Sequence, residues 1–190
     1  MAGEDDGRRI RGEEKIEIEP YDPRWARDFD DERARIAAAL GGLAIRIEHN
    51  GSTSVPGLAA KPIIDIQIAV ASLQPIDAYA RPLATVGYSH APHEDDSFCP
   101  FFHRPAVWPH THHVHLVSAG GSEERRTLAF RDYLRDHPAS AREYEALKRA
   151  LAAELTLDGA AAREAYAAAK TSFIERVIAL ALAQGYGCHT

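Results

Sequence analysis

The stretch that decides the fold is residues 47–70, which reads IEHNGSTSVPGLAAKPIIDIQIAV. Residues 62–70 are almost continuously apolar and β-branched, the pattern of a central strand covered on both faces. Residues 43–48 alternate in polarity, which predicts another strand. The turn-rich residues 49–57 lie between them and contain the pair Gly51-Ser52. The stretch therefore predicts two strands separated by a glycine–serine loop.

The second of these strands carries an acidic residue, Asp65, inside its apolar run. An aspartate in such surroundings must be paired, hydrogen-bonded or bound to a metal. Strand geometry places residues 65 and 67 on the same face. Position 67 is Gln67, a neutral amide that is a poorer Mg²⁺ ligand than a carboxylate. We therefore take Asp65 and Gln67 as candidate catalytic residues.

The loop before this strand supplies candidate substrate-binding residues. Backbone N–H groups at the start of a helix, with glycine permitting close approach, form a cradle for phosphate. Lys61 closes the loop four residues before Asp65, where it would hold a phosphate or a carboxylate, or else be a solvated loop lysine. The candidates from this segment are Gly51, Ser52, Thr53, Ser54 and Lys61.

The histidines add a candidate metal site. His113-Val114-His115 falls on an expected strand, so both imidazoles point to one face. If that strand neighbours the Asp65 strand, then Asp65, His113 and His115 converge as a ligand set that suits Fe(II), Mn, Zn or Cu. Alternatively, these are partly exposed strand histidines in a chain with ten. His49, directly before the loop, is a candidate fourth ligand, a contact to a ligand, or a general base.

The rest of the chain reads as a short strand, alternating helices and strands, and a helical final third. Residues 1–14 have the composition of a disordered tail, which leaves residues 15–190 as a single domain. We expect a strand at 16–18, helices after Asp22-Pro23 and at 76–86, and a strand at 114–117. Residues 90–109 read as loop with at most one short strand. Helices are then expected from Ser122 to Leu134, from Pro138 to Leu155 and, as one Ala-rich helix, from Gly159 to Gly185.

The helical third also carries basic and aromatic residues. A guanidinium pairs bidentately with carboxylate or phosphate, so Arg131 is a candidate substrate-binding residue. Arg135, Lys148 and Lys170 are similar candidates, and each of the four is alternatively part of a solvated helix face. Tyr144 and Tyr166 recur with the apolar helix positions, so we interpret them as core residues before pocket residues.

The composition limits the class of protein. The chain has 190 residues and a net charge of −6, which argues against broad binding to nucleic acid or to an anionic membrane. Its two cysteines form no disulfide framework, and they read as free thiols in a reducing compartment. No window approaches the ~20 apolar residues that a bilayer crossing needs, and the charged N-terminus is no secretory signal. We therefore expect a cytoplasmic protein with a small-molecule partner, either a monomer or a homodimer.

The segment 47–70 resembles the signature of the GrpB family, usually an IEHIGSTSVPGL run followed by AKPIID. Residues 130–151, FRDYLRDHPASAREYEALKRAL, and residues 166–177, YAAAKTSFIERV, resemble the helical half of that family. The resemblance implies an α/β (α+β) fold with a nucleotidyltransferase-like mixed β-sheet, flanking helices and a helical C-terminal third. In that superfamily a Gly-Ser pair opens a helix and an Asp-x-Asp/Glu pair follows. Gln67 departs from this pattern.

Three functions follow as hypotheses. The first is a metal-dependent enzyme that acts on a small polar or anionic substrate, with one Fe, Mn, Cu or Zn ion held by Asp65, His113 and His115. The second is a Mg²⁺-dependent nucleotidyltransferase that transfers a nucleotidyl group from a nucleoside triphosphate to a small molecule. The third is a non-catalytic nucleotide- or ligand-binding module, for which the loss of the acid pair at Gln67 is the best evidence.

Overall fold

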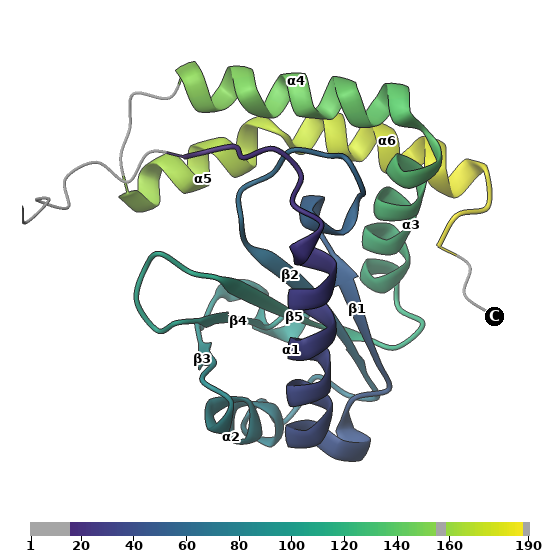
Figure 1. Ribbon diagram of the computed structural model, residues 1–190. Coiled ribbons are helices and arrows are strands. Elements are labelled where there is room, and N and C mark those ends of the chain that lie inside the picture. Colours follow the sequence, from purple (N-terminus) through teal and green to yellow (C-terminus); the bar gives the residue numbers. More distant parts are fainter. Residues whose placement is uncertain (1–15, 155–158, 188–190) are drawn as a thin grey trace, which may run out of the picture.

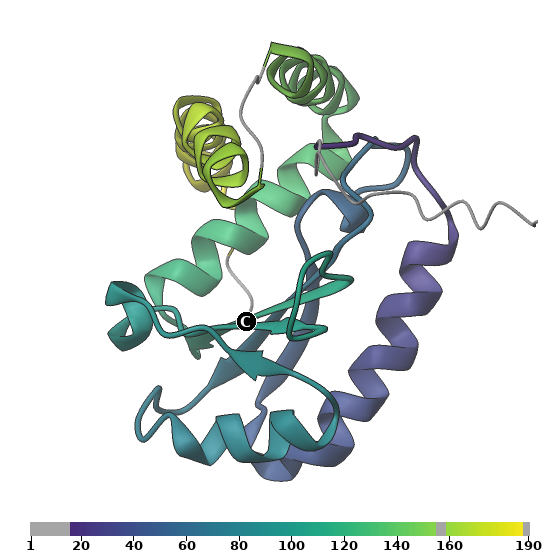
Figure 2. The ribbon, with the colours of Figure 1, turned by 90° about the vertical axis from the view of Figure 1, so that its left-hand side faces the viewer.

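The computed structural model describes residues 16–154 and 159–187, and a mixed five-stranded sheet forms its centre (Figures 1 and 2). The strands lie in the order β1-β2-β5-β4-β3. Only β2 and β5 are parallel, and the other neighbours are antiparallel. The bounds are β1 Arg46–Asn50, β2 Ile64–Val70, β3 Ser89–His90, β4 Phe101–Arg104 and β5 His112–Ser118. The expected mixed sheet is thus confirmed.

Helices cover both faces of this sheet (Figure 2). On one face lie α1 Arg24–Leu40 and α2 Asp77–Thr85, and on the other lies α3 Ser122–Asp136. Beyond α3 follow α4 Pro138–Glu154, α5 Gly159–Ala169 and α6 Thr171–Ala183, which confirm the helical final third. Short 3₁₀ turns occupy Gly41–Leu43, Ser52–Ser54 and Glu94–Ser97. None of the helices in the described part of the chain combines the length and the apolar character that a membrane crossing requires.

Alternation along β2 divides the sheet into an apolar and a polar face. Ile66 and Ile68 point into the main core with Trp25 and Phe29 of α1. Asp65 and Gln67, which alternate with these isoleucines along the strand, point to the opposite face, towards α3–α6. A second apolar cluster, built from Val55, Leu58 and residues of α3, α4 and α6, fixes these helices over the loop between β1 and β2. The space between the polar face and the helices is where the candidate site lies.

Several elements differ from the sequence expectation. Residues 16–18 form no strand, and only an isolated bridge joins Glu19 to Ala60. The first strand begins at Arg46 because Gly41–Leu43 close the preceding helix as a 3₁₀ turn. Residues 90–109 contain β4 as well as the end of β3. The expected tail at 1–14 lies outside the described residues.

The Ala-rich helix is interrupted, so two helices replace the one expected. At Lys170 the backbone N–H donates to the carbonyl of Ala167, three residues back, and α6 begins one residue later. The Gly51-Ser52 pair likewise does not open a full helix, since the 3₁₀ turn that follows has only three residues. A helix N-terminus is therefore not the feature that would bind phosphate here.

Candidate functional site

A cavity of about 480 Å³ lies between the polar face of the sheet and helices α3–α6. This volume falls in the usual range for sites that bind small molecules. The loop and strands contribute Asn50, Gly51, Ser52, Lys61, Asp65, Gln67, His113 and His115, and the helices contribute Glu123, Thr127, Tyr144, Lys148, Tyr166 and Lys170. Candidates from the loop, the strands and the helices thus meet at one cavity, whereas His49, Ser54 and Arg131 are not among its lining residues.

Asp65 lies at the start of β2, between Asn50 of β1 and His113 of β5 in the strand register. Its Oδ1 atom is 3.3 Å from Nδ1 of His113. Burial alone would raise the pKa of Asp65, but the His113 hydrogen bond and nearby positive charges, including Lys61, outweigh it and leave the pKa lowered. Asp65 is therefore an ionised carboxylate in the cavity wall at neutral pH.

Gly51 is held directly against this carboxylate. Its φ angle is +66°, and a Cβ atom at this position would lie 2.1 Å from Oδ2 of Asp65. Only glycine permits both this conformation and this approach. Within the same turn Ser54 Oγ donates to the carbonyl of Gly51 at 2.6 Å, and Thr53 Oγ1 donates to the carbonyl of Ile63 at 3.2 Å. Thr53 and Ser54 therefore stabilise the turn.

Three lysines meet at the same cavity, Lys61 from the loop before β2 and Lys148 and Lys170 from the helical third, and they gather around two tyrosines. The Nζ atoms of Lys61 and Lys170 lie 5.0 and 4.1 Å from the centre of the Tyr166 ring. Nζ of Lys148 lies 4.8 Å from the centre of the Tyr144 ring and donates to the carbonyl of Ala59. The chain contains four lysines, and three of them line this one cavity.

Burial disfavours the charged form of these three lysine side chains and so lowers their pKa values. It lowers the pKa of Lys148 to about 7, with a smaller contribution from the positive charge of Lys170. It lowers the pKa of Lys170 to about 8, with Lys61 contributing repulsion, and it also lowers the pKa of Lys61. Among the described residues, none of the three forms an ion pair with a carboxylate. An anion in the cavity would relieve both the repulsion and the lost hydration.

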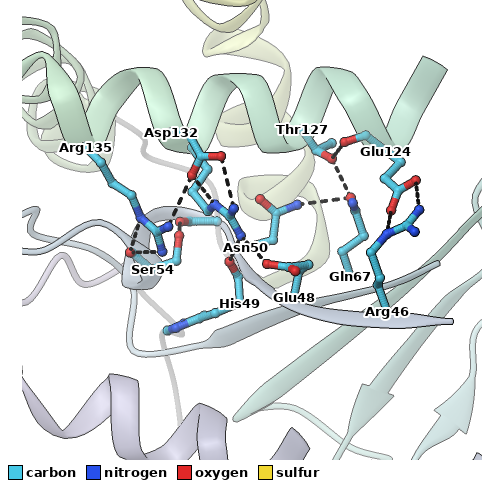
Figure 3. A network of polar contacts seen from close by, with 12 residues as sticks. Arg46, Glu48, His49, Asn50, Ser54, Gln67, Glu124, Thr127, Asp132 and Arg135 are labelled. Atoms are coloured by element: carbon cyan, nitrogen blue, oxygen red, sulfur yellow. Dashed lines mark hydrogen bonds and ion pairs between the residues drawn. The ribbon is translucent and has the colours of Figure 1, made fainter. Parts of the chain in front are cut away.

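Gln67 contributes an unsatisfied donor to the cavity wall. Its Oε1 accepts hydrogen bonds from Thr127 Oγ1 and, at 3.3 Å, from Asn50 Nδ2 (Figure 3). The residue is 1% exposed, and within the described part of the chain its Nε2 has no hydrogen-bond partner. Buried amide groups are rarely left unpaired, because the lost hydration is not replaced. This unpaired donor therefore indicates that a bound ligand supplies a hydrogen-bond acceptor to Gln67 Nε2.

Two of the three histidines of β5, His113 and His115, line the cavity but do not form a ready metal site. His113 Nε2 is 3.2 Å from Nδ1 of His110, and His115 Nδ1 is 3.8 Å from Sγ of Cys99. The described residues contain no group of three or more His, Cys, Asp or Glu side chains arranged to hold a metal ion. The contact between His115 and Cys99 had no sequence signal, because sixteen residues separate the two positions.

His49 points away from the cavity, to the opposite face of β1. Its ring stacks on Phe29 of α1 with centroids 4.7 Å apart, and its Nε2 is 3.1 Å from Oγ1 of Thr53. Burial lowers its pKa to about 4, so the imidazole is neutral at physiological pH. The structure thus makes His49 part of the support for the turn and does not bring it to the cavity with Asp65.

Arg131 also lies outside the cavity lining. Its guanidinium contacts Glu48 Oε2 at 2.8 Å, the carbonyl of His49 at 3.0 Å and the carboxylate of Asp132 at 2.7 Å. In the same region Arg135 donates to the carbonyl of Ser54, and Arg46 pairs with Glu124 (Figure 3). These contacts attach α3 to β1 and to the turn, so the arginines of α3 position the site.

Replacing Arg131 by alanine is expected to lower the free energy of unfolding by about 1.5–3 kcal/mol, because the buried guanidinium loses its hydrogen bonds to Glu48, to Asp132 and to the carbonyl of His49. Urea denaturation measures the change. Arg142→Ala removes an exposed arginine of α4 and is expected to change stability by less than ~0.5 kcal/mol. Equal effects of the two substitutions would contradict the anchoring role of Arg131.

The comparisons place the chain in a known family. The model of the GrpB protein family matches residues 15–179. UPF0157 protein BH1888 of Halalkalibacterium halodurans is 40% identical over 86% of this chain and 80% of its own length. UPF0157 protein YqkA of Bacillus subtilis is 40% identical over 74% of this chain, which spans only 40% of that protein.

Two further relatives extend the comparison. The crystal structure of the conserved protein GrpB from Enterococcus faecalis superposes with a TM-score of 0.78 and 33% identity, covering 88% of this chain and 98% of that one. A dephospho-CoA kinase of Mycolicibacterium paratuberculosis is 33% identical over 76% of this chain, which spans 41% of that protein. The chain therefore belongs to the GrpB family, whose fold is nucleotidyltransferase-like.

Proposed function

We propose that this chain is an enzyme that binds a small phosphorylated or otherwise anionic substrate in the cavity and acts on it beside Asp65. The observation that carries the proposal is the gathering of Lys61, Lys148 and Lys170 at one cavity wall. Lys148 is buried, and Lys61 and Lys170 are partly buried. Enclosing three ammonium groups without an ion pair to a carboxylate costs free energy that a bound anion would offset. A phosphate accepts several charge-assisted hydrogen bonds and suits such a wall.

Asp65 gives the cavity a group that can take part in a reaction. An ionised carboxylate beside a bound phosphate can orient a hydroxyl nucleophile and accept its proton. Gly51 fixes the carboxylate from one side and His113 hydrogen-bonds it from another, so its position is set before the substrate binds. Nucleotidyl or phosphoryl transfer to or from the bound substrate is the reaction class that this arrangement supports best.

A magnesium ion fits this proposal only together with the substrate. Mg²⁺ is commonly bound by one or two carboxylates plus substrate phosphates, and Asp65 with Asn50 would supply the protein oxygens. The bound ion would neutralise charge on the phosphate. Gln67 in place of a second carboxylate, and three nearby ammonium groups, make a Mg²⁺ ion without phosphate unfavourable here.

A transition-metal enzyme is the second hypothesis, favoured by the 3.3 Å contact between Asp65 and His113 and by the place of His115 on the same wall. Elemental analysis of the purified protein and of the variants Asp65→Ala and His115→Ala tests it. Stoichiometric Fe, Mn, Cu or Zn in the unsubstituted protein, lost in both variants, would establish this function.

The anionic-substrate proposal is tested by thermal unfolding with tripolyphosphate and with nucleoside triphosphates, each with and without Mg²⁺. We expect stabilisation, and we expect Lys148→Met and Lys170→Met each to weaken binding at least about tenfold, the loss of one charge-assisted contact. Arg149→Met removes a neighbouring cation of α4 whose partner is Glu145, and it should bind as the unsubstituted protein does. Unchanged melting temperatures with every phosphate compound would refute the proposal.

A further inference from the structure

The lining of the cavity extends along β2, and its two ends differ in chemistry. Lys61 precedes β2, Asp65 stands at its start, and Gln67 follows on the same face. Val117 of β5 pairs with Ala69 near the other end of the strand. At about 3.3 Å per residue, the Asp65 row and the Val117 row lie about 13 Å apart. A ligand that fills the cavity therefore reaches from the lysines to the beginning of α3.

The end near α3 carries neutral polar groups and one carboxylate. α3 starts four residues after β5, so Glu123 and Thr127 lie at this end. Thr127 hydrogen-bonds Gln67, whose Nε2 remains the buried donor without a partner. Glu123 offers acceptor oxygens. A head group with hydroxyls, which both accept and donate hydrogen bonds, would match Gln67 Nε2 and the Glu123 carboxylate together.

The described lining of the cavity offers few free aromatic faces on which a nucleobase could stack. The described lining contains two tyrosines, Tyr144 and Tyr166, which belong to the lysine end. Its two imidazoles, His113 and His115, lie beside Asp65 and Gln67 in the strand register, and both already pack against Phe101. Tyr144 already stacks on Phe173 with centroids 5.1 Å apart and contacts Lys148, and Tyr166 contacts two ammonium groups. Recognition of a nucleobase commonly uses a free aromatic face. At the far end the apolar lining residues are the aliphatic Val117 and Ile174.

We propose that the substrate is a phosphate ester of a small, hydroxylated, non-aromatic head group, that is, a sugar or polyol phosphate. Its phosphate lies against Lys61, Lys148 and Lys170, and its hydroxyls bind Gln67 Nε2 and Glu123. This inference rests on the proposed function, because it uses the same cavity and the same anion-binding wall.

Isothermal titration calorimetry with inorganic phosphate, ribose, ribose 5-phosphate and adenosine 5′-monophosphate tests the head group. Ribose 5-phosphate is expected to bind at least about tenfold more tightly than inorganic phosphate, since the head group adds a hydrogen bond to a donor that otherwise has none. The adenine base should add less than about threefold, and ribose alone should bind weakly. Lys148→Met should weaken all three phosphate compounds.

Two substitutions of Gln67 isolate the donor. Gln67→Glu keeps an acceptor oxygen for Thr127 and Asn50 but replaces the Nε2 donor, whereas Gln67→Met removes both groups at similar size. In each variant the advantage of ribose 5-phosphate over inorganic phosphate should disappear, with melting temperatures confirming that the protein is folded.

The outcomes separate the two proposals. A tenfold gain from the adenine base, or an unchanged advantage of ribose 5-phosphate in both Gln67 variants, would overturn the head-group assignment and leave the anion site standing. Absence of binding by inorganic phosphate, ribose 5-phosphate and tripolyphosphate alike would overturn the proposed function itself.

Discussion

Gly51→Ala is expected to abolish substrate binding and to lower the melting temperature by several degrees. A side chain at φ +66° costs about 1–3 kcal/mol, which corresponds to roughly 2–4 °C per kcal/mol for a domain of this size. The new methyl group would also lie 2.1 Å from Oδ2 of Asp65 and 2.8 Å from its Cβ. The Asp65 carboxylate must therefore move away from residue 51, and its contact with His113 is disturbed.

Gly57→Ala is the matched control. Gly57 belongs to the same loop and has a φ angle of +80°, but a Cβ atom there would meet no atom within 4 Å. This variant therefore carries the backbone strain without the collision, and it should lose stability while it still binds tripolyphosphate. Thermal unfolding and calorimetric titration of both variants measure the difference. Full binding by Gly51→Ala would show that the position of Asp65 does not matter for the ligand.

The parts of the fold that the sequence predicts well are those with an unbroken local pattern. β2 follows from its continuous apolar run, and the shared direction of Asp65 and Gln67 follows from strand alternation. The sequence leaves open whether the His113 strand neighbours the Asp65 strand, and the register shows that it does, with the two residues paired. The helical final third follows from regular spacing of its apolar residues.

The parts that could not be predicted depend on packing between distant segments. A lysine on a helix has the same local sequence whether it faces water or a cavity, and only the placement of α4–α6 over the sheet brings Lys148 and Lys170 together. His49 precedes the loop directly, but it falls on the face of β1 that packs on α1. Arg131 has the residue type of a phosphate ligand, yet its guanidinium is already bound by Glu48 and Asp132.

The distribution of cations gives the site a consistent physical interpretation. Arginines make the ion pairs on the surface and those that attach α3 to the sheet, where a permanently charged, planar group is suitable. Lysines line the cavity, where burial shifts the pKa values of Lys148 and Lys170 towards neutrality. The charge of the cavity is therefore adjustable near physiological pH, and this property leads to a test by pH.

Sulfate, which does not titrate in this range, is expected to bind at least about tenfold more weakly at pH 9 than at pH 6.5. Lys148 and Lys170, with pKa values of about 7 and 8, lose their protons across this interval. Each pH unit above its pKa lowers the charged fraction of an amine about tenfold. Bound sulfate favours the charged amines, so binding at pH 8 should take up protons. Calorimetry in buffers of different ionisation enthalpy measures that uptake.

The stability of the free protein should change in the opposite direction. The pKa of Lys148 is about 7 in the folded state and its ordinary value is 10.5, so between these values the unfolded chain binds more protons. The contribution of Lys148 to stability therefore rises with pH from about 7 to about 10.5. Lys148→Met should remove this rise and flatten the sulfate profile, whereas Arg149→Met, which removes only a minor repulsion on Lys148, should leave most of both in place. A sulfate affinity that stays constant from pH 6.5 to 9 would mean that Lys148 and Lys170 do not hold the anion.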